Sequence, residues 1–263
     1  MKYIVFSFDD GRADTYTVAM PIMQKYGLTA TVNIISDYVL HPDKYSFTTS
    51  SKAMTAEQVL KWQEWGEIAS HGSTHKNTAE DIIRSLDELR SIGVHGNIGF
   101  ASPESWLTDR NADSSGIYEL KRNGIISYLR SGIQIRREGV VYTALSIAEL
   151  YTHSSLLYYF LNRQNIIHSG QEYRIFPSCA VKDYSTVRQL KKMVKKVADK
   201  DALIIMFHSV LEKGDPLYGK DHYFWDATRF DQFCQWLCNQ TDVRVITTME
   251  LCRIIETQNR ERG

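Results

Sequence analysis

Short apolar runs rich in β-branched and aromatic residues recur along the chain, and such runs predict strands. They cover residues 3–8, 30–35, 67–70, 98–101, 125–129, 140–145, 173–176, 202–207 and 243–246. Most of these runs do not alternate apolar with polar residues. Unalternating strands are typical of a parallel sheet or barrel that helices cover, because both faces of each strand are then buried.

Helical patterns lie between many of these runs. Thr55 followed by Gln58, and Thr78 followed by Asp81, resemble the capping arrangements that begin helices. Residues 187–197 carry one apolar stripe with lysines on the opposite face, which predicts an amphipathic surface helix. A basic patch for polyanions is the alternative interpretation of those lysines. The alternation of strands and helices predicts an α/β fold.

The organisation of the chain indicates one domain, residues 1–263. Single α/β barrels reach this length, and the sequence contains no internal repeat, low-complexity segment or long Pro/Gly/Ser linker. Residues 37–51 lack a clear period and follow the second predicted strand. We therefore expect them to form a loop insertion above a barrel rather than a linker.

Composition narrows the classes of partner. Lys plus Arg equals Asp plus Glu at 31 each, so no strong net field attracts nucleic acid or an anionic membrane nonspecifically. No apolar run approaches the roughly 18 residues of a membrane span, which predicts no integral membrane segment. The first predicted strand begins at Tyr3 and leaves no room for a signal peptide, so we expect a cytoplasmic protein by default, or an exported one if a signal sequence has been removed.

The four cysteines form no C-x-x-C pair, which disfavours disulfides and structural zinc. We expect buried free thiols at all four positions. These are Cys179, Cys234, Cys238 and Cys252.

Three predicted strands end in residues capable of metal binding or acid–base chemistry. Asp9 and Asp10 follow the first strand and precede Gly11, which also suits an ordinary turn. His71 and His75 follow the third strand, and a helical turn between them would bring both rings to one side. Two imidazoles and a carboxylate are a common ligand set for a catalytic divalent metal, although such a pair of histidines is often incidental.

His208 ends the apolar run 202–207. A buried histidine satisfied by hydrogen bonds is the plainer interpretation of this residue. In a closed barrel, however, strand ends from distant parts of the sequence converge on one rim, where the active site lies. The sequence therefore predicts that His208 joins the aspartates and the histidine pair.

These motifs, in this order, resemble the polysaccharide deacetylase family, also called the NodB-homology or carbohydrate esterase 4 family. Residues 7–11, Ser-Phe-Asp-Asp-Gly, are similar to its first motif T-F-D-D-G, and His71 and His75 match H-[ST]-x-x-H with Gly72 in the second place. The resemblance spans nearly the whole chain. It implies a distorted (β/α) barrel of about seven strands and hydrolysis of an acetyl group from an N-acetylated sugar or polysaccharide.

By that resemblance, Asp10, His71 and His75 hold a divalent metal, with Zn²⁺ first and Co²⁺, Fe²⁺, Mn²⁺ or Ni²⁺ as alternatives. Asp9 is the general base and His208 the general acid. A carbohydrate is the expected partner, with no nucleic acid, and the oligomeric state is left open.

The third and fourth motifs depart from the family pattern. Ala101 stands where some members have the arginine that holds the catalytic aspartate, and we expect Arg130 to take that role. The segment of Pro103 and Glu104 is expected to bind substrate and to offer a backbone N–H to the oxyanion. The family's Asp-Trp pair is matched only by Asp183 and Tyr184, which are expected to partner the acid and to line the pocket.

Two other functions stay open at this point. The first is a carbohydrate-binding protein that keeps the barrel but no longer turns over substrate, which the altered third motif favours. The second is a related hydrolase that acts on a non-sugar amide, because fold alone does not fix the substrate. Several aromatic residues could stack on sugar rings near the rim, although such residues are more often part of a core. They are Trp106, Tyr151, Tyr158, Tyr159, Tyr223, Phe224 and Trp225.

Overall fold

The computed structural model describes residues 1–44, 51–132, 140–220 and 222–260. Twelve strands lie in these ranges. They are β1 (Lys2–Phe8), β2 (Thr31–Ile34), β3 (Glu67–Ser70), β4 (Phe100–Ala101), β5 (Leu129–Ser131), β6 (Ile166–Ile167), β7 (Phe176–Pro177), β8 (Cys179–Ala180), β9 (Ala202–Phe207), β10 (Ser209–Leu211), β11 (Phe224–Asp226) and β12 (Val243–Ile246).

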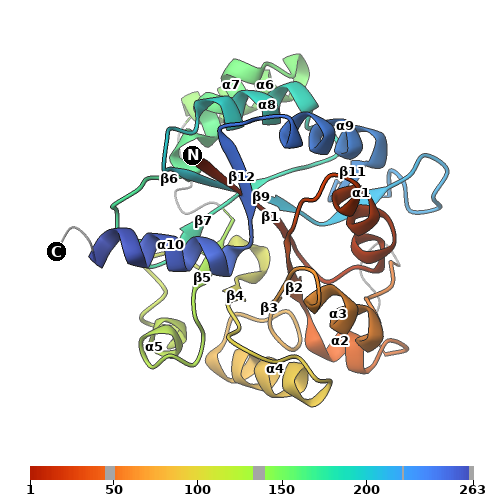
Figure 1. The fold of residues 1–263 in the computed structure, drawn as a ribbon, viewed down its shortest axis with the longest axis vertical. Coiled ribbons are helices and arrows are strands. Elements are labelled where there is room, and N and C mark those ends of the chain that lie inside the picture. Colours follow the sequence, from red (N-terminus) through yellow and green to blue (C-terminus); the bar gives the residue numbers. More distant parts are fainter. Residues whose placement is uncertain (45–50, 133–139, 221, 261–263) are drawn as a thin grey trace.

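Helices surround the strands on most sides (Figure 1). The α-helices are α1 (Met20–Lys25), α2 (Ser36–Leu40), α3 (Ala56–Gln63), α4 (Ala79–Ser91), α5 (Ile117–Arg122), α6 (Val140–Thr152), α7 (Ser155–Asn162), α8 (Val187–Lys196), α9 (Ala227–Cys238) and α10 (Thr248–Arg260). Three short helical segments complete the description, the π-helix η1 (Thr15–Ala19) and the 3-10 helices η2 (Pro103–Ser105) and η3 (Arg163–Asn165). In the part of the chain that is described, no helix combines the length and the apolar character needed to cross a membrane.

The main sheet has the strand order β6-β9-β1-β2-β3-β4-β5-β7, with β12 paired to β1 and β8 paired to β9. All its pairs are parallel except β6 with β9. One short segment nearly closes it into a barrel, since Phe176–Pro177 pairs with β5 and Cys179–Ala180 pairs with β9 at the opposite end of the strand order. The predicted α/β barrel is therefore confirmed, with ten strands in the described sheet rather than about seven.

Most predicted strand runs overlap observed strands, but one prediction is wrong. Residues 140–145, expected as a strand, form the first half of the helix α6. The least exposed residues of this helix are Leu145, Ala148 and Glu149, whose spacing of three and four is helical. The run at 98–101 contains the whole of β4, whereas the runs at 125–129 and 173–176 reach only the first residue of β5 and of β7, because the preceding residues approach the sheet as loops.

The helix starts agree with the sequence patterns. Thr55 and Gln58 form a reciprocal capping box, and the Thr78 hydroxyl accepts from the backbone N–H of Asp81. The predicted loop at residues 37–51 is partly wrong, since Ser36–Leu40 is helical, and residues 45–50 lie outside the described part. The single-domain organisation stays a prediction.

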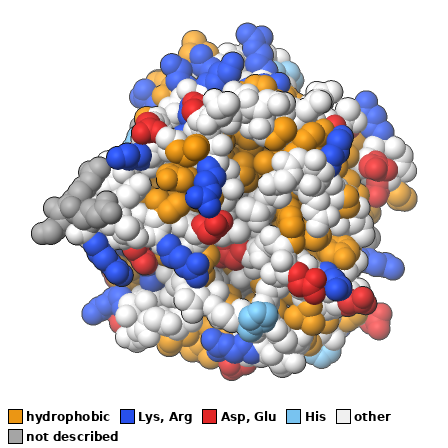
Figure 2. Space-filling model, in the orientation of Figure 1, with side chains coloured by type: hydrophobic (Ala, Val, Ile, Leu, Met, Phe, Trp, Pro, Cys, Tyr) orange, Lys and Arg blue, Asp and Glu red, His pale blue; other side chains and the backbone are white. Residues whose placement is uncertain are grey.

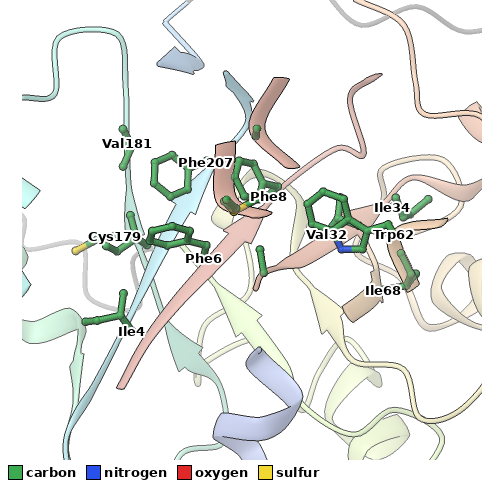
Figure 3. Close-up of a cluster of buried hydrophobic side chains, with 14 of the residues drawn as sticks. Ile4, Phe6, Phe8, Val32, Ile34, Trp62, Ile68, Cys179, Val181 and Phe207 are labelled. Carbon is green, nitrogen blue, oxygen red and sulfur yellow. The ribbon is translucent and has the colours of Figure 1, made fainter. Parts of the chain in front are cut away.

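Alternation along the strands decides which side chains face outward and which face the barrel interior. Ile4, Phe6 and Phe8 of β1 point to one side, where Phe207 of β9 packs against Phe6 and Phe8 (Figure 3). Val5 belongs to a separate buried cluster that includes residues of α10. Residues 5, 7 and 9 therefore share the other face, and the last of them is Asp9.

The surface carries charges of both signs. Figure 2 shows Lys and Arg beside Asp and Glu, with apolar side chains between them, as the balanced composition leads one to expect. The cysteines are free, but only Cys179, Cys234 and Cys252 are buried. The expectation of buried thiols is thus wrong for Cys238, which is exposed on the last turn of α9.

Candidate active site at the carboxyl ends of the strands

The parallel register brings the predicted functional residues to one rim. Asp9 follows β1, His71 follows β3 and His208 follows β9, each directly after the last residue of its strand, and Asp10 is one residue further on. Arg130 lies in the middle of β5, where it is opposite Ala101 of β4. Because the carboxyl ends of parallel strands meet at one edge, residues nearly 200 positions apart become neighbours.

The turn after β1 aims the Asp10 carboxylate at this rim. Asp10 and Gly11 both have left-handed backbone conformations, with φ of 74° and 65°. A Cβ atom at Gly11 would lie 2.7 Å from Cδ1 of Ile34, so a glycine is needed at this position. The tight reversal leaves both Asp9 and Asp10 buried.

His71 and His75 come together through a loop and not through a helical turn, so that part of the sequence interpretation is wrong. Residues 71–77 are irregular, and His75 itself has a left-handed φ of 62°. The two ring centroids are nevertheless 5.0 Å apart. Nδ1 of His71 donates to the Ala101 carbonyl at 2.8 Å, which leaves its Nε2 as the lone-pair nitrogen.

Asp10, His71 and His75 fit a divalent cation. Oδ1 of Asp10 is 3.5 Å from Nε2 of His71 and 3.7 Å from Nε2 of His75. Donor atoms around a tetrahedral ion with bonds of about 2.1 Å lie about 3.4 Å apart, so these separations need little adjustment. These three residues also form the one group of potential metal ligands found in the described part of the chain.

The surroundings of Asp10 and His75 favour the protonation states in which these side chains can bind a cation. Burial raises the pKa of Asp10, but the neighbouring His71 ring and the charges of His208 and Arg12 hold the pKa well below the usual 3.8. Burial and the neighbouring His71 ring lower the pKa of His75. An ionised carboxylate and a neutral imidazole are the forms that bind a cation.

Asp9 lies beside this group and is held by two donors on one oxygen. The Arg130 guanidinium and Nδ2 of Asn33, the latter at 2.8 Å, both donate to Oδ1. Burial raises the pKa of Asp9, but Arg130 and then the His71 and His208 rings lower it, so that the net pKa lies below the usual value. Among the described residues, none donates to Oδ2, which is left as the oxygen able to take a proton.

Arg130 therefore occupies the place that Ala101 leaves empty. It is almost wholly buried, and its Nη1 also contacts the sulfur of Met206 at 3.1 Å. Ala101 contributes only its carbonyl oxygen, which binds His71. The contact expected between Arg130 and Asp9 is present, while the catalytic role assigned to this pair stays a prediction.

His208 lies within the electrostatic reach of both aspartates, but Asp183 does not partner it. Within the described residues, Nδ1 of His208 is buried and has no hydrogen-bond partner. The Asp183 carboxylate instead contacts Nδ1 of His222 at 2.9 Å. Burial lowers the pKa of His208, although the charges of Asp10 and Asp9 act in the opposite direction.

Tyr223 contacts His208 and connects it with the Asp183–Tyr184 region. The ring centroids of Tyr223 and His208 are 4.8 Å apart. Nζ of Lys182 lies 5.9 Å from the Tyr223 centroid and 6.0 Å from that of Tyr184. Partly exposed Tyr223 provides an aromatic surface beside His208, while the substrate-binding role expected of half-buried Tyr184 stays a prediction.

The third motif forms the short turn η2 on the side of His75. Glu104 has a left-handed φ of 54°, and its carboxylate, like that of Asp10, partly offsets the lowering of the His75 pKa by burial and by the His71 ring. The Pro103 carbonyl accepts from Asn77 at 3.0 Å. Because proline has no N–H, the expected oxyanion donor of this segment can only be the backbone of Glu104 or a residue after it.

The sequence interpretation missed two residues of the site. Asn33 is the one amide in β2, and its Nδ2 donates to Ser7, Phe8 and Asp9. Arg12 directly follows the Asp-Asp-Gly turn and contacts Asp10 with Nε at 3.0 Å and Nη2 at 2.9 Å. A polar residue inside a buried strand was a usable signal for Asn33, whereas Arg12 resembles an ordinary loop residue.

Fold and site together define a (β/α)-barrel protein with a candidate metal centre and an acid–base pair at the carboxyl ends of its strands. Residues 1–103 match the family model described as "Polysaccharide deacetylase", which confirms the resemblance indicated by the motifs. This region includes the first two motifs and the third as far as Pro103, whereas Glu104, Arg130, Asp183 and His208 lie beyond it. No curated protein matches the chain.

Solved structures share the fold over nearly the whole chain. A putative polysaccharide deacetylase from Mycobacterium smegmatis is 14% identical with a TM-score of 0.56, over 98% of this chain and 91% of that one. The peptidoglycan deacetylase PdaC from Bacillus subtilis is 12% identical with a TM-score of 0.51, over 99% and 95%. A family 4 acetyl xylan esterase from Clostridium thermocellum, in complex with a cobalt ion, is 13% identical with a TM-score of 0.50, over 96% and 91%.

Proposed function

We propose that this protein is a metal-dependent hydrolase that removes an acetyl group from an N-acetylated sugar or polysaccharide. The observation that carries the proposal is the convergence of Asp10, His71 and His75 beside an aspartate held by Arg130. The match of residues 1–103 to a family of polysaccharide deacetylases supports the acetyl group and the carbohydrate as substrate. The cytoplasmic location stays a prediction.

Oδ1 of Asp10, Nε2 of His71 and Nε2 of His75 are the atoms that would hold the cation. A bound divalent cation lowers the pKa of a water molecule and polarises a carbonyl group. Three protein donors leave a position for the substrate, which is the arrangement of catalytic zinc sites. Zn²⁺ is our first choice, and Co²⁺, Fe²⁺, Mn²⁺ and Ni²⁺ suit the same donors.

Asp9 acts as the general base in this proposal. Its lowered pKa keeps the carboxylate ionised at neutral pH, and the donors on Oδ1 hold the side chain while Oδ2 accepts the proton of the attacking water. Asn33 and Arg130 bind the same oxygen from different strands, so the carboxylate has little freedom to rotate. This fixed orientation favours proton transfer because it is set before the substrate arrives.

His208 acts as the general acid. An amide nitrogen leaves poorly as an anion, so it needs a proton as the carbon–nitrogen bond breaks. The lowered pKa of His208 makes its protonated ring a better proton donor. Asp9 and Asp10 lie close enough to stabilise that charged form, and the Tyr223 ring covers one side of the imidazole.

Acetate release is the direct test. The purified protein is depleted of metal with a chelator, reloaded with Zn²⁺ or Co²⁺, and incubated with N-acetylated oligosaccharides of several sugars. We expect acetate release with added metal, no release without it, and loss of release in Asp9→Asn. Binding of an oligosaccharide without acetate release under every metal would instead identify a carbohydrate-binding protein.

A further inference from the structure

Arg12 holds one oxygen of the candidate ligand Asp10 in a specific way. Its Nε and Nη2 atoms both contact Oδ2 of Asp10, at 3.0 and 2.9 Å. The other oxygen, Oδ1, is the one that faces Nε2 of His71 and of His75. The side chains of Arg12 and Asp10 are each only 8% exposed, so water does not compete strongly for these contacts.

The guanidinium of Arg12 is itself anchored on its far side. Nη1 donates to Oγ of Ser209 at 3.2 Å, and this hydroxyl donates to Oδ2 of Asp14 at 3.0 Å. Oδ1 of Asp14 accepts from the backbone N–H of Val210 at 2.8 Å. The chain of contacts therefore runs from Asp10 through Arg12 to β10, which follows His208 directly.

The reversal at Asp10 and Gly11 is what brings Arg12 back onto Asp10. Arginine suits this position because its planar fork contacts Asp10 and Ser209 with different nitrogens at once. A lysine has the same charge but only one nitrogen, so it could not hold both partners in this geometry. Charge and positioning can therefore be separated by experiment.

We propose that Arg12 is a positioning residue that keeps Oδ2 of Asp10 away from the cation, so that Asp10 offers a single oxygen together with His71 and His75. This inference rests on the proposed function, because it presupposes that the three residues bind a metal ion. Arg12 would not bind the metal ion itself, but it would determine that Asp10 binds the ion through one carboxylate oxygen. Groups that orient metal ligands commonly contribute about 10- to 100-fold in affinity.

Cobalt binding tests the inference without any measurement of activity. Metal-free wild-type protein, Arg12→Lys and a control Arg122→Lys are titrated with Co²⁺, and the visible absorption per bound ion is recorded. Arg122 is an exposed residue of α5 paired with Glu119, so its replacement keeps the charge balance far from the site. Arg12→Lys keeps the positive charge near the cation. Any change in Co²⁺ binding or absorption is therefore due to the loss of the guanidinium contacts with Asp10 and Ser209.

We expect Arg12→Lys to bind Co²⁺ about 10- to 100-fold more weakly than wild type. We also expect weaker absorption per bound ion, because a second carboxylate oxygen raises the coordination number above four. Ser209→Ala, which loosens the guanidinium without touching Asp10, should change both quantities in the same direction by a smaller factor. Arg122→Lys should match wild type.

Other outcomes would contradict either the role proposed for Arg12 or the proposed metal site. Wild-type affinity and absorption in Arg12→Lys would overturn the inference and leave the proposed function intact. Weaker binding with unchanged absorption and a lower melting temperature of the metal-free protein would also overturn it, since Arg12 would then be only structural. Absence of Co²⁺ binding in wild type would overturn the proposed metal site, and with it the inference.

Discussion

Arg130 of β5 donates to the carboxylate of Asp9, which lies 121 positions earlier and follows β1. Both side chains are almost completely buried. Two buried charges in contact stabilise one another, whereas removal of one partner leaves the other unpaired in a low-dielectric environment. The pair thus connects opposite sides of the barrel and keeps the proposed base ionised.

The first prediction follows from this pair. Arg130→Met removes the charge that lowers the pKa of Asp9, so burial should raise this pKa. Asp9 must be ionised to act as a base, and the acidic limb of the profile of kcat/KM against pH should therefore move to higher pH. Initial rates between pH 5 and pH 9 measure the shift. Arg122→Met on the exposed face of α5 is the control, and an unmoved limb in Arg130→Met would contradict the role assigned to Arg130.

The second prediction concerns the metal ligands. His71→Ala and His75→Ala each remove one of three protein donors, so both should lower the bound metal and the activity together. Metal content by elemental analysis, measured alongside acetate release, checks this. His95→Ala provides a matched control because His95 is exposed after α4 and contacts Gln63. Full metal content in both ligand variants would rule out the proposed triad.

The third prediction concerns Asp14, whose pKa burial raises to about 6 against the hydrogen bonds from Val210 and Ser209. A raised pKa means that the folded state binds the proton more tightly than the unfolded state. The resulting stabilisation is complete below the ordinary pKa of 3.8 and is lost as the pH rises through about 6. A shift of this size corresponds to about 3 kcal/mol.

Asp14→Asn lacks this titration, and comparison with it isolates the contribution of Asp14. The free energy of unfolding of wild type, relative to Asp14→Asn, should fall by about 2 kcal/mol between pH 4 and pH 7, because the unfolded Asp14 is already partly ionised at pH 4. Chemical denaturation of both metal-free proteins at several pH values gives the difference. Parallel stability curves for the two proteins would show that the Asp14 carboxyl is not perturbed by folding.

The sequence predicted the parts of the site that depend on strand ends. Asp9, His71 and His208 each follow a short apolar run, and parallel strands bring such positions to one rim whatever their separation in sequence. Arg130 was expected on other grounds, because Ala101 stands where the resembling family has an arginine and Arg130 follows the next predicted strand. The general fold followed from the alternation of strand and helix patterns.

Other features depended on tertiary context. Val140 and Val141 gave residues 140–145 the composition of a strand, but both side chains are exposed, and the segment begins the helix α6, which contacts α7. The loop that joins His71 and His75 has no period that a sequence pattern could reveal. The pairing of Asp183 with His222 was not predictable either, because it depends on how the segment after β10 folds back.

The last prediction separates the roles of Asp9 and His208, which metal analysis cannot do because neither belongs to the ligand set. Asp9→Asn keeps the shape of the side chain but cannot take a proton from water, so turnover should drop by about 10²- to 10⁴-fold with the metal retained. His208→Ala should also retain the metal. The two variants should differ on an activated aryl acetate, whose leaving group departs without protonation. This substrate should rescue His208→Ala far more than Asp9→Asn, because the attack on the carbonyl still needs the base. Initial rates on the amide and on the ester, with His95→Ala as the control, give the two ratios, and equal losses on both substrates in both variants would contradict the assignment of base and acid.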